Sequence, residues 1–223
     1  FHLSCKVTSV DGHNVTFVDS EGTEHTVEGD KILLSVGRRP ITKGFGLESL
    51  GVELERGGIK VDNRMRTNVE GVYAAGDVTG FSMLAHTASR EAEVVIHNLC
   101  GHDDTMCYNA IPGIVYTNPE VAGVGLTEAQ ALQQGIGHKC LRLPMAYSGR
   151  FVAENEGGEG ICKVIVEKET RRIVGVHMLG NPCSEIIGTA CIAIEQGMTI
   201  EQFEHVVLPH PTVTEILKET VEI

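Results

Sequence analysis

The chain has 223 residues, which is enough for one large domain or two smaller ones with a proper core. Its net charge of -12 would repel phosphate backbones and anionic membrane surfaces, and with no Trp and 4% aromatic residues it offers few rings for bases to stack on. No apolar run approaches the roughly 20 residues that span a bilayer. Neither nucleic acid nor a membrane is therefore an expected partner.

The first 30 residues predict a β-meander. CKVTSV and NVTFVD alternate apolar and polar residues, and Asp11-Gly12 supplies a turn between them. Glu21-Gly22 turns the chain again before TEHTVEG. The opening FHLSCKV has no initiator Met and no signal-peptide pattern and reads as the middle of a strand, so we expect a fragment or a processed chain.

A non-alternating apolar run, ILLSVG at residues 32–37, predicts a strand buried on both faces, as in a parallel sheet. GIKVD and GVYAAGD predict two further strands, the second ending in Asp77. Strand, glycine turn and a following helix would make half of a doubly wound unit, where ligands bind at the carboxyl ends of strands. The apolar face of that helix should hold Leu84, Ala88, Ala92, Val95, Ile96 and Leu99.

From about residue 107 the pattern predicts a separate α+β domain of ordinary size. ICKVIVE and IVGVHML flank KETRR as an antiparallel hairpin, and EIIGTACIAIEQG predicts an apolar helix. Thr127 with Gln130 and Thr199 with Gln202 fit the capping boxes of two short helices. The expected fold class is thus α/β plus α+β: partial doubly wound nucleotide-binding domains, then an α+β domain with an antiparallel sheet.

The seven cysteines are scattered, odd in number and contain no C-x-x-C pair. This pattern argues against a zinc site and against a secreted disulfide framework. It predicts buried, inert thiols in a reducing cytoplasm. The His102-Asp103-Asp104 cluster has no metal-ligand spacing and is expected to be structural or exposed. No metal site is predicted.

Asp77 is the first candidate site residue. An isolated AGD would ordinarily be a solvated turn, but a carboxylate at a strand end, with small neighbours and a helix start nearby, fits a hydroxyl-binding site. The phosphate loops G-x-G-x-x-G and G-x-x-x-x-G-K-S/T are absent. The chain therefore has the second half of a dinucleotide-type fold without its first half. By themselves, Gly37 and His86 are an ordinary strand-end glycine and helix-start histidine.

The stretch LPHPTVTE, residues 208–215, has two explanations. Thr212 with Glu215 fits a capping box, in which each side chain satisfies a backbone N–H of the first helical turn. His210 and Glu215, separated by a proline turn, equally fit a general base and its orienting carboxylate. Both explanations use the one carboxylate of Glu215.

Six stretches occur together and in order: SVGRRP, TNVEGVYAAGDVTG, MLAHTA, YTNPEVAGVGLTE, GVHMLG and HPTVTE. Over essentially the whole chain they resemble the flavin-dependent pyridine nucleotide–disulfide oxidoreductases. MLAH at this spacing from AGD is most similar to the dihydrolipoamide dehydrogenases. Glutathione reductase and its relatives share AGD and HPTxxE but usually differ at MLAH.

The resemblance implies a C-terminal half in three parts. Residues 1–37 would end an NAD-binding domain, 38–106 would complete an FAD-binding domain, and 107–223 would be the interface domain of a homodimer. Gly37 would lie beside the nicotinamide nucleotide, and Asp77 would bind the ribityl–pyrophosphate part of FAD. The residues implied to line the flavin are Met83, Leu84, Ala85 and His86.

The resemblance also implies the chemistry. His210, oriented by Glu215, would reach into the partner subunit's active site and take a proton from dihydrolipoamide. The thiolate would then attack a redox disulfide beside the flavin, which a thiol does poorly. An imidazole has an ordinary pKa of about 6.5, and a carboxylate neighbour raises its basicity. We expect Glu215 to favour His210 over the Thr212 backbone in the dimer.

One departure from the family limits the chain. Its seven cysteines hold no C-x-x-x-x-C redox pair, and both glycine-rich loops are missing, so we expect the 223 residues alone to be inactive. The implied partners are a second copy and a lipoyl-bearing protein of a 2-oxo acid dehydrogenase or glycine cleavage complex. Two alternatives stay open: a homodimerisation module without catalysis, and the same part of a glutathione-reductase-like enzyme.

Overall fold

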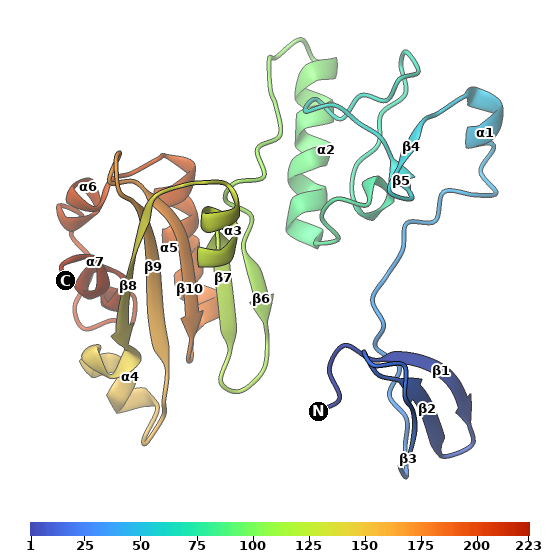
Figure 1. Ribbon diagram of the computed structural model, residues 1–223. Coiled ribbons are helices and arrows are strands. Elements are labelled where there is room, and N and C mark those ends of the chain that lie inside the picture. The colour runs from blue at the N-terminus through green and yellow to red at the C-terminus, as the bar shows by residue number, and fades with distance from the viewer. The chain divides into compact units, whose positions relative to one another are not determined.

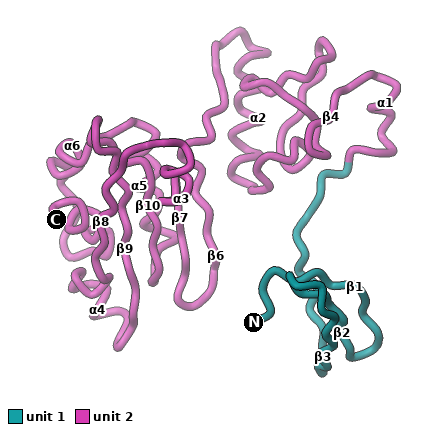
Figure 2. Tube along the Cα trace, in the orientation of Figure 1, with its two compact units in different colours: residues 1–41 teal, residues 42–223 magenta.

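The computed structural model describes all 223 residues, and they form two compact units, residues 1–41 and 42–223 (Figure 2). The first unit contains antiparallel strands only, and the second contains helices and antiparallel strands (Figure 1). The expected mixed α/β and α+β class is confirmed. None of the helices combines the length and the apolar composition that a membrane span requires. The finer division at residues 37 and 106 stays a prediction.

The first unit contains the predicted β-meander. Its three strands pair antiparallel in chain order: β1 (Lys6–Asp11), β2 (Asn14–Val18) and β3 (Glu24–Glu28). Phe17 is buried, and its ring stacks on that of His25 at 5.4 Å between centroids. Asp19 closes the second turn by accepting the backbone N–H of Glu21 and of Thr23, both at 2.9 Å.

Two predicted strands are wrong. Residues 32–37 pair with no other segment, and Leu33 is 91% exposed. GVYAAGD makes one isolated bridge, between Arg66 and Tyr73, instead of a strand. A parallel strand depends on hydrogen-bonded neighbours and on cover over both faces. Because no segment of this chain supplies them, an apolar run alone does not form the strand.

Residues 42–106 contain four short elements and one long helix between irregular stretches. They are α1 (Leu47–Leu50), β4 (Leu54–Glu55), β5 (Gly58–Ile59), η1 (Asp77–Thr79) and α2 (Ala85–Leu99), with β4 and β5 paired antiparallel. A small core of Met65, Val94 and Met106 packs α2 against the preceding loop and the segment that follows it. This packing holds α2 to the irregular stretches on either side of it.

The predicted helix α2 is confirmed, but the apolar face predicted for it is only partly buried. Thr87, Glu91 and Val94 are the buried residues, whereas Ile96 and Leu99 of the expected apolar face are 56% and 58% exposed. Apolar periodicity predicts the side of a helix that a partner would cover. This chain covers that side of α2 only in part, because Leu84, Ala88 and Val95 are half-buried.

Residues 107–223 form a five-stranded antiparallel sheet with helices around it, in strand order β6-β7-β10-β9-β8. The strands are β6 (Gly113–Val115), β7 (Val121–Gly125), β8 (His138–Pro144), β9 (Ile161–Glu167) and β10 (Ile173–Leu179). The helices are α3 (Glu128–Gln133), η2 (Met145–Tyr147), α4 (Gly149–Glu154), α5 (Cys183–Glu195), α6 (Ile200–Glu204) and α7 (Glu215–Val221). The predicted β9–β10 hairpin and the helix α5 are confirmed.

The main core lies between this sheet and its helices. α5 packs on β7 and β10, and α7 packs on β8 and β9, within one continuous buried cluster. Ile187 and Ile216 are among its fully buried side chains, each of which stabilises the fold by about 1.5–3 kcal/mol relative to exposure. Both predicted capping boxes form, at Thr127 and at Thr199. The sheet therefore gives α7 a rigid support.

Candidate functional site

The loop before α7 presents His210 to solvent. Val213 in the loop and Ile216 and Leu217 in the helix are buried, so they fix this turn to the core. The His210 side chain is 82% exposed, and its Nδ1 lies 3.0 Å from Oε1 and 3.2 Å from Oε2 of Glu215. The structure thus brings the predicted base and its predicted carboxylate together.

Glu215 also serves the backbone. The Thr212 N–H donates to Oε2 of Glu215 at 2.8 Å, which is one half of the predicted capping box. The other half is wrong, because the Thr212 hydroxyl donates to the Pro209 carbonyl at 2.8 Å and α7 has no side-chain cap. The expected competition for Glu215 does not arise in this chain, since its two oxygens accept from both donors.

The electrostatics favour an ionised Glu215. The Thr212 N–H, and then the His210 ring, hold the pKa of the Glu215 carboxyl below its usual value. A carboxylate accepts hydrogen bonds only, so His210 donates from Nδ1–H. That tautomer leaves the lone pair on Nε2, the ring nitrogen without a partner in this chain. Nε2 can therefore take a proton from a group that approaches the exposed ring.

Asp77 lies at the start of η1, on a turn that requires glycine. Gly76 has φ 83° and ψ -158°, and a Cβ on it would come within 3.3 Å of the Ala88 Cβ. The Thr79 hydroxyl donates to the Gly76 carbonyl at 2.9 Å and stiffens the turn. The Asp77 carboxylate is exposed and accepts no hydrogen bond. An unpaired carboxylate on a fixed turn fits the hydroxyl groups of an FAD ribityl chain.

The four residues predicted to line the flavin follow Asp77 closely. Met83 and Leu84 are half-buried, while Ala85 and His86 are exposed at the start of α2. The Nε2 of His86 lies 3.0 Å from the Pro112 carbonyl, so this ring ties α2 to the segment before β6. Their roles toward a flavin stay predictions.

Gly37 belongs to the first unit. It is exposed, with φ 86° in the left-handed region that favours glycine. The strand predicted to end at this glycine is absent, so Gly37 does not lie at the edge of a sheet. Its role beside a nicotinamide nucleotide stays a prediction.

Glu91 is a site residue that the sequence did not reveal. It is fully buried in the middle of α2, where Oε2 accepts the Gly76 N–H at 2.5 Å and Oε1 accepts the Tyr108 hydroxyl at 2.7 Å. The available signal was its spacing from Thr87 and Val94, which puts all three on one helix face. An acid on a helix is usually solvated. The prediction for this helix therefore followed its apolar residues and did not include Glu91.

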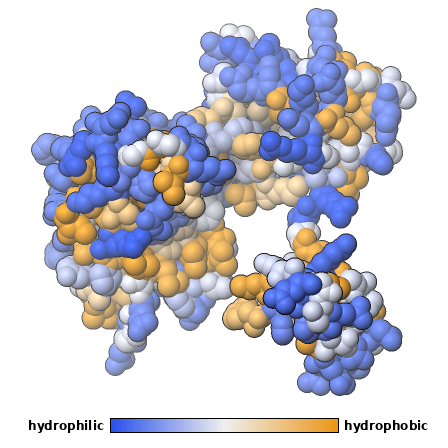
Figure 3. All heavy atoms as spheres, in the orientation of Figure 1, coloured by the Kyte–Doolittle hydropathy of each residue, from blue (hydrophilic) through white to orange (hydrophobic).

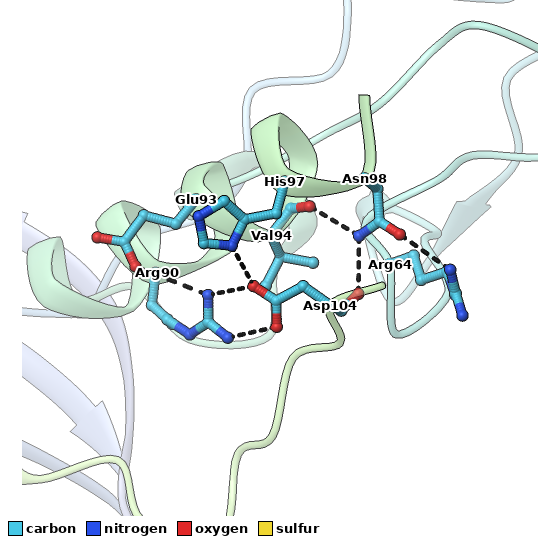
Figure 4. Close-up of polar contacts among 7 residues, drawn as sticks. All are labelled: Arg64, Arg90, Glu93, Val94, His97, Asn98 and Asp104. Carbon is cyan, nitrogen blue, oxygen red and sulfur yellow. Dashed lines mark hydrogen bonds and ion pairs between the residues drawn. The ribbon is translucent and has the colours of Figure 1, made fainter. Parts of the chain in front are cut away.

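Asp104 of the histidine–aspartate cluster has a structural role, as predicted (Figure 4). Its carboxylate accepts two hydrogen bonds from Arg90, at 2.8 and 2.6 Å, and one from His97 Nδ1 at 2.7 Å. Asn98 donates to its backbone carbonyl at 2.7 Å. These bonds hold the end of α2 to the segment that leads to β6. No group of three or more His, Cys, Asp or Glu side chains could hold a metal ion.

The cysteines are all free thiols, but only some are buried. Burial raises the pKa of Cys162 to about 11 and that of Cys183 to about 12. The expectation of buried, inert thiols is therefore correct for these two. It is wrong for Cys100 and Cys107, which are exposed.

Two family models match the chain. The pyridine nucleotide-disulphide oxidoreductase model matches residues 1–92, and the dimerisation domain of the same oxidoreductases matches residues 111–221. The chain belongs to the pyridine nucleotide-disulphide oxidoreductase family. The predicted resemblance is confirmed, and the turn at Asp77 and the pair His210–Glu215 lie in the parts that match the two models.

Similar proteins include the mitochondrial dihydrolipoyl dehydrogenase of Pisum sativum, at 41% identity over 98% of this chain and 45% of the relative. Leghemoglobin reductase of Glycine max is also 41% identical, over 98% of this chain and 43% of its own. The crystal structure of LpdA from Mycobacterium tuberculosis has a TM-score of 0.85 and 26% identity, over 98% of this chain and 48% of that one. The chain thus spans about half the length of the relatives it matches.

Proposed function

We propose that the chain acts as the C-terminal half of a flavin-dependent dihydrolipoamide dehydrogenase, in which His210 is the base. The observation that carries this proposal is the hydrogen bond from Nδ1 of His210 to the carboxylate of Glu215, which leaves an exposed Nε2. A base must have a free lone pair and an approach for the substrate, and His210 has both.

The proton transfer and the disulfide exchange form one balanced sequence. Nε2 of His210 takes the proton of one dihydrolipoamide thiol, and the resulting thiolate attacks a sulfur of the family's redox disulfide. That S–S bond breaks, a mixed disulfide forms and the other cysteine leaves as a thiolate. His210 then gives its proton to the released cysteine and takes the proton of the second substrate thiol. The resulting thiolate attacks the substrate sulfur of the mixed disulfide, which releases oxidised lipoamide and leaves the second cysteine as a thiolate.

FAD, when bound, carries the two electrons of the reduced cysteine pair to NAD. Asp77 would hold the ribityl–pyrophosphate part, Met83, Leu84, Ala85 and His86 would line the flavin, and Gly37 would approach the nicotinamide nucleotide. The redox cysteines and the glycine-rich loops are absent from the 223 residues. We infer that these residues alone are inactive, and that the complete enzyme supplies the remaining groups.

In a homodimer, the exposed His210 would lie in the active site of the partner subunit. Residues 111–221 match a dimerisation domain, and apolar side chains reach the surface of this part of the chain (Figure 3). Its exposed large apolar residues include Tyr116, Leu132, Tyr147 and Val207. In the dimer, His210 would enter the partner's site. The lipoyl group would be borne by a protein of a 2-oxo acid dehydrogenase or glycine cleavage complex, and the free thiols suit a reducing cytoplasm.

Substrate profiling of the complete enzyme tests the reaction. Because the same part of a glutathione-reductase-like enzyme is the alternative, the assay should compare dihydrolipoamide with NAD against oxidised glutathione with NADPH. The proposal predicts rapid NADH formation from dihydrolipoamide and little turnover of glutathione. The reverse preference would place the chain in a glutathione-reductase-like enzyme.

A second candidate function is a dimerisation module that performs no chemistry. The match of residues 111–221 to a dimerisation domain favours it for the chain taken alone. Sedimentation equilibrium of the 223-residue chain should show a dimer. A strictly monomeric species at high protein concentration would count against this function.

A further inference from the structure

Glu91 is a buried carboxylate without a charged partner. Its side chain has no exposed surface, and its two oxygens accept from the Gly76 N–H at 2.5 Å and from the Tyr108 hydroxyl at 2.7 Å. Burying a carboxylate is costly unless its hydrogen bonds are satisfied. An alanine or leucine would fill this position of α2 without the free-energy cost of burying a carboxylate. We therefore attribute the acid to its two hydrogen bonds, with Gly76 and Tyr108.

One oxygen of Glu91 holds the turn that carries Asp77. Gly76 directly precedes Asp77, and its N–H is fixed by Glu91. The opposite flank of the turn is closed by Gly58 of β5, where a Cβ would lie 2.1 Å from the Thr79 carbonyl oxygen. The turn is therefore held between α2 and β5, and little movement is available to it.

On the other side Glu91 holds Tyr108, which lies beyond α2 in the chain. The ring of Tyr108 packs on Phe81, with 4.3 Å between centroids, and Phe81 follows the same turn. Burial and the Glu91 carboxylate raise the pKa of Tyr108, so its hydroxyl stays a donor. Tyr108 thus contacts the turn twice, once through Glu91 and once through Phe81.

We propose that Glu91 and Tyr108 are positioning residues that set the Gly76–Asp77 turn so that Asp77 faces the ribityl–pyrophosphate part of FAD. This inference rests on the proposed function. It adds a physical link from Tyr108, at the start of the predicted interface domain, through the carboxylate of Glu91 to the cofactor-binding turn. Neither residue touches the cofactor in this scheme.

Amide hydrogen exchange on the 223-residue chain tests the link without any cofactor. Glu91→Ala removes both acceptors, so exchange of the Gly76 amide, which donates to Glu91, should become about tenfold faster or more. Glu91→Gln should restore slow exchange, because its amide oxygen can accept from Gly76 and its NH₂ can donate to Tyr108. Glu93→Ala, which alters an exposed acid on the same helix, is the matched control. Unchanged exchange at Gly76 in Glu91→Ala would overturn the link.

The FAD dissociation constant of the complete enzyme, measured by flavin fluorescence, tests whether Glu91 and Tyr108 support FAD binding. We expect Glu91→Ala to raise it about tenfold and Glu91→Gln to bring it back near the wild-type value. If Glu91→Ala does not fold, Tyr108→Phe removes only the hydroxyl and should raise the constant by a smaller factor in the same direction. Equal constants in wild type, Glu91→Ala and Tyr108→Phe would overturn the inference while the proposed function stands. A wild-type enzyme that binds no FAD would overturn both, while exchange at Gly76 would still report on the link.

Discussion

Nδ1 of His210 lies 3.0 Å from Oε1 of Glu215, and the other oxygen of that carboxylate accepts the Thr212 N–H at 2.8 Å. One side chain therefore both orients the imidazole and closes the start of α7. The bond from the Thr212 N–H helps to fix the carboxylate that the ring contacts. The start of α7 and the orientation of the proposed base therefore depend on the same carboxylate, that of Glu215.

Removal of the Glu215 carboxylate should impair the base without removing it. We expect Glu215→Ala in the complete enzyme to lower turnover of dihydrolipoamide roughly ten- to hundredfold, because the ring loses its orientation. Glu215→Gln, whose amide oxygen can still accept from both donors, should be less affected. Steady-state NADH formation measures both, with Glu222→Ala at the C-cap of α7 as control. Equal turnover in Glu215→Ala and wild type would show that the carboxylate only caps the helix.

A methyl group at Gly58 should disturb the turn that carries Asp77. The Cβ of Gly58→Ala would lie 2.1 Å from the Thr79 carbonyl oxygen, so the backbone has to shift. Overpacking of this kind costs about 1–3 kcal/mol in the free energy of unfolding. Gly113→Ala is the matched strand control, because its Cβ meets nothing within 4 Å. Urea unfolding of both variants tests the difference, and similar midpoints would contradict it.

The Asp104 bonds in Figure 4 should make the chain sensitive to acid. Arg90, and then His97, hold the pKa of the Asp104 carboxyl well below its usual range. A carboxyl with a lowered folded-state pKa stabilises the fold above its ordinary pKa of about 4, and this stability is lost as the pH falls through the folded value. Asp104→Asn should therefore show a smaller fall in melting temperature from about pH 5 to pH 2.

The neighbouring residue supplies the control for that measurement. Asp103 is 79% exposed and forms one ion pair with Arg64, so Asp103→Asn should keep the wild-type pH dependence. Identical pH profiles for Asp104→Asn and wild type would mean that the Arg90 and His97 bonds do not stabilise the fold.

The thiols should react in two classes. Cys162 and Cys183 are buried with raised pKa values of about 11 and about 12, so they should resist a thiol reagent at neutral pH until the chain unfolds. Cys100 and Cys107 are exposed and should be labelled first. Peptide mass spectrometry after brief labelling identifies the order. Early labelling of Cys162 would indicate that the main core opens readily.

Local patterns predicted local structure well. The β9–β10 hairpin depends on alternation and a turn within neighbouring residues, and the capping boxes at Thr127 and Thr199 depend on groups three positions apart. The contact of His210 with Glu215 spans five positions across one turn, so it too could be predicted. In each case the interacting groups lie on the same short segment.

Predictions that depended on distant partners were less successful. ILLSVG has the composition of a buried parallel strand, but no other segment of this chain pairs with it. Glu91 was missed for a related reason, since its partners Gly76 and Tyr108 lie 15 and 17 positions away. No local pattern marks a buried acid whose acceptor role is set by two separate loops.

The central claim is that His210 is the base of a dihydrolipoamide dehydrogenase, and one substitution tests it most directly. In the complete enzyme, His210→Gln should lower dihydrolipoamide oxidation at least about hundredfold, because the proton acceptor is lost. The flavin absorbance should stay unchanged, and His205→Gln, an exposed histidine on the C-cap of α6, should keep wild-type turnover. Near-normal dihydrolipoamide oxidation by His210→Gln, with FAD bound, would contradict the claim.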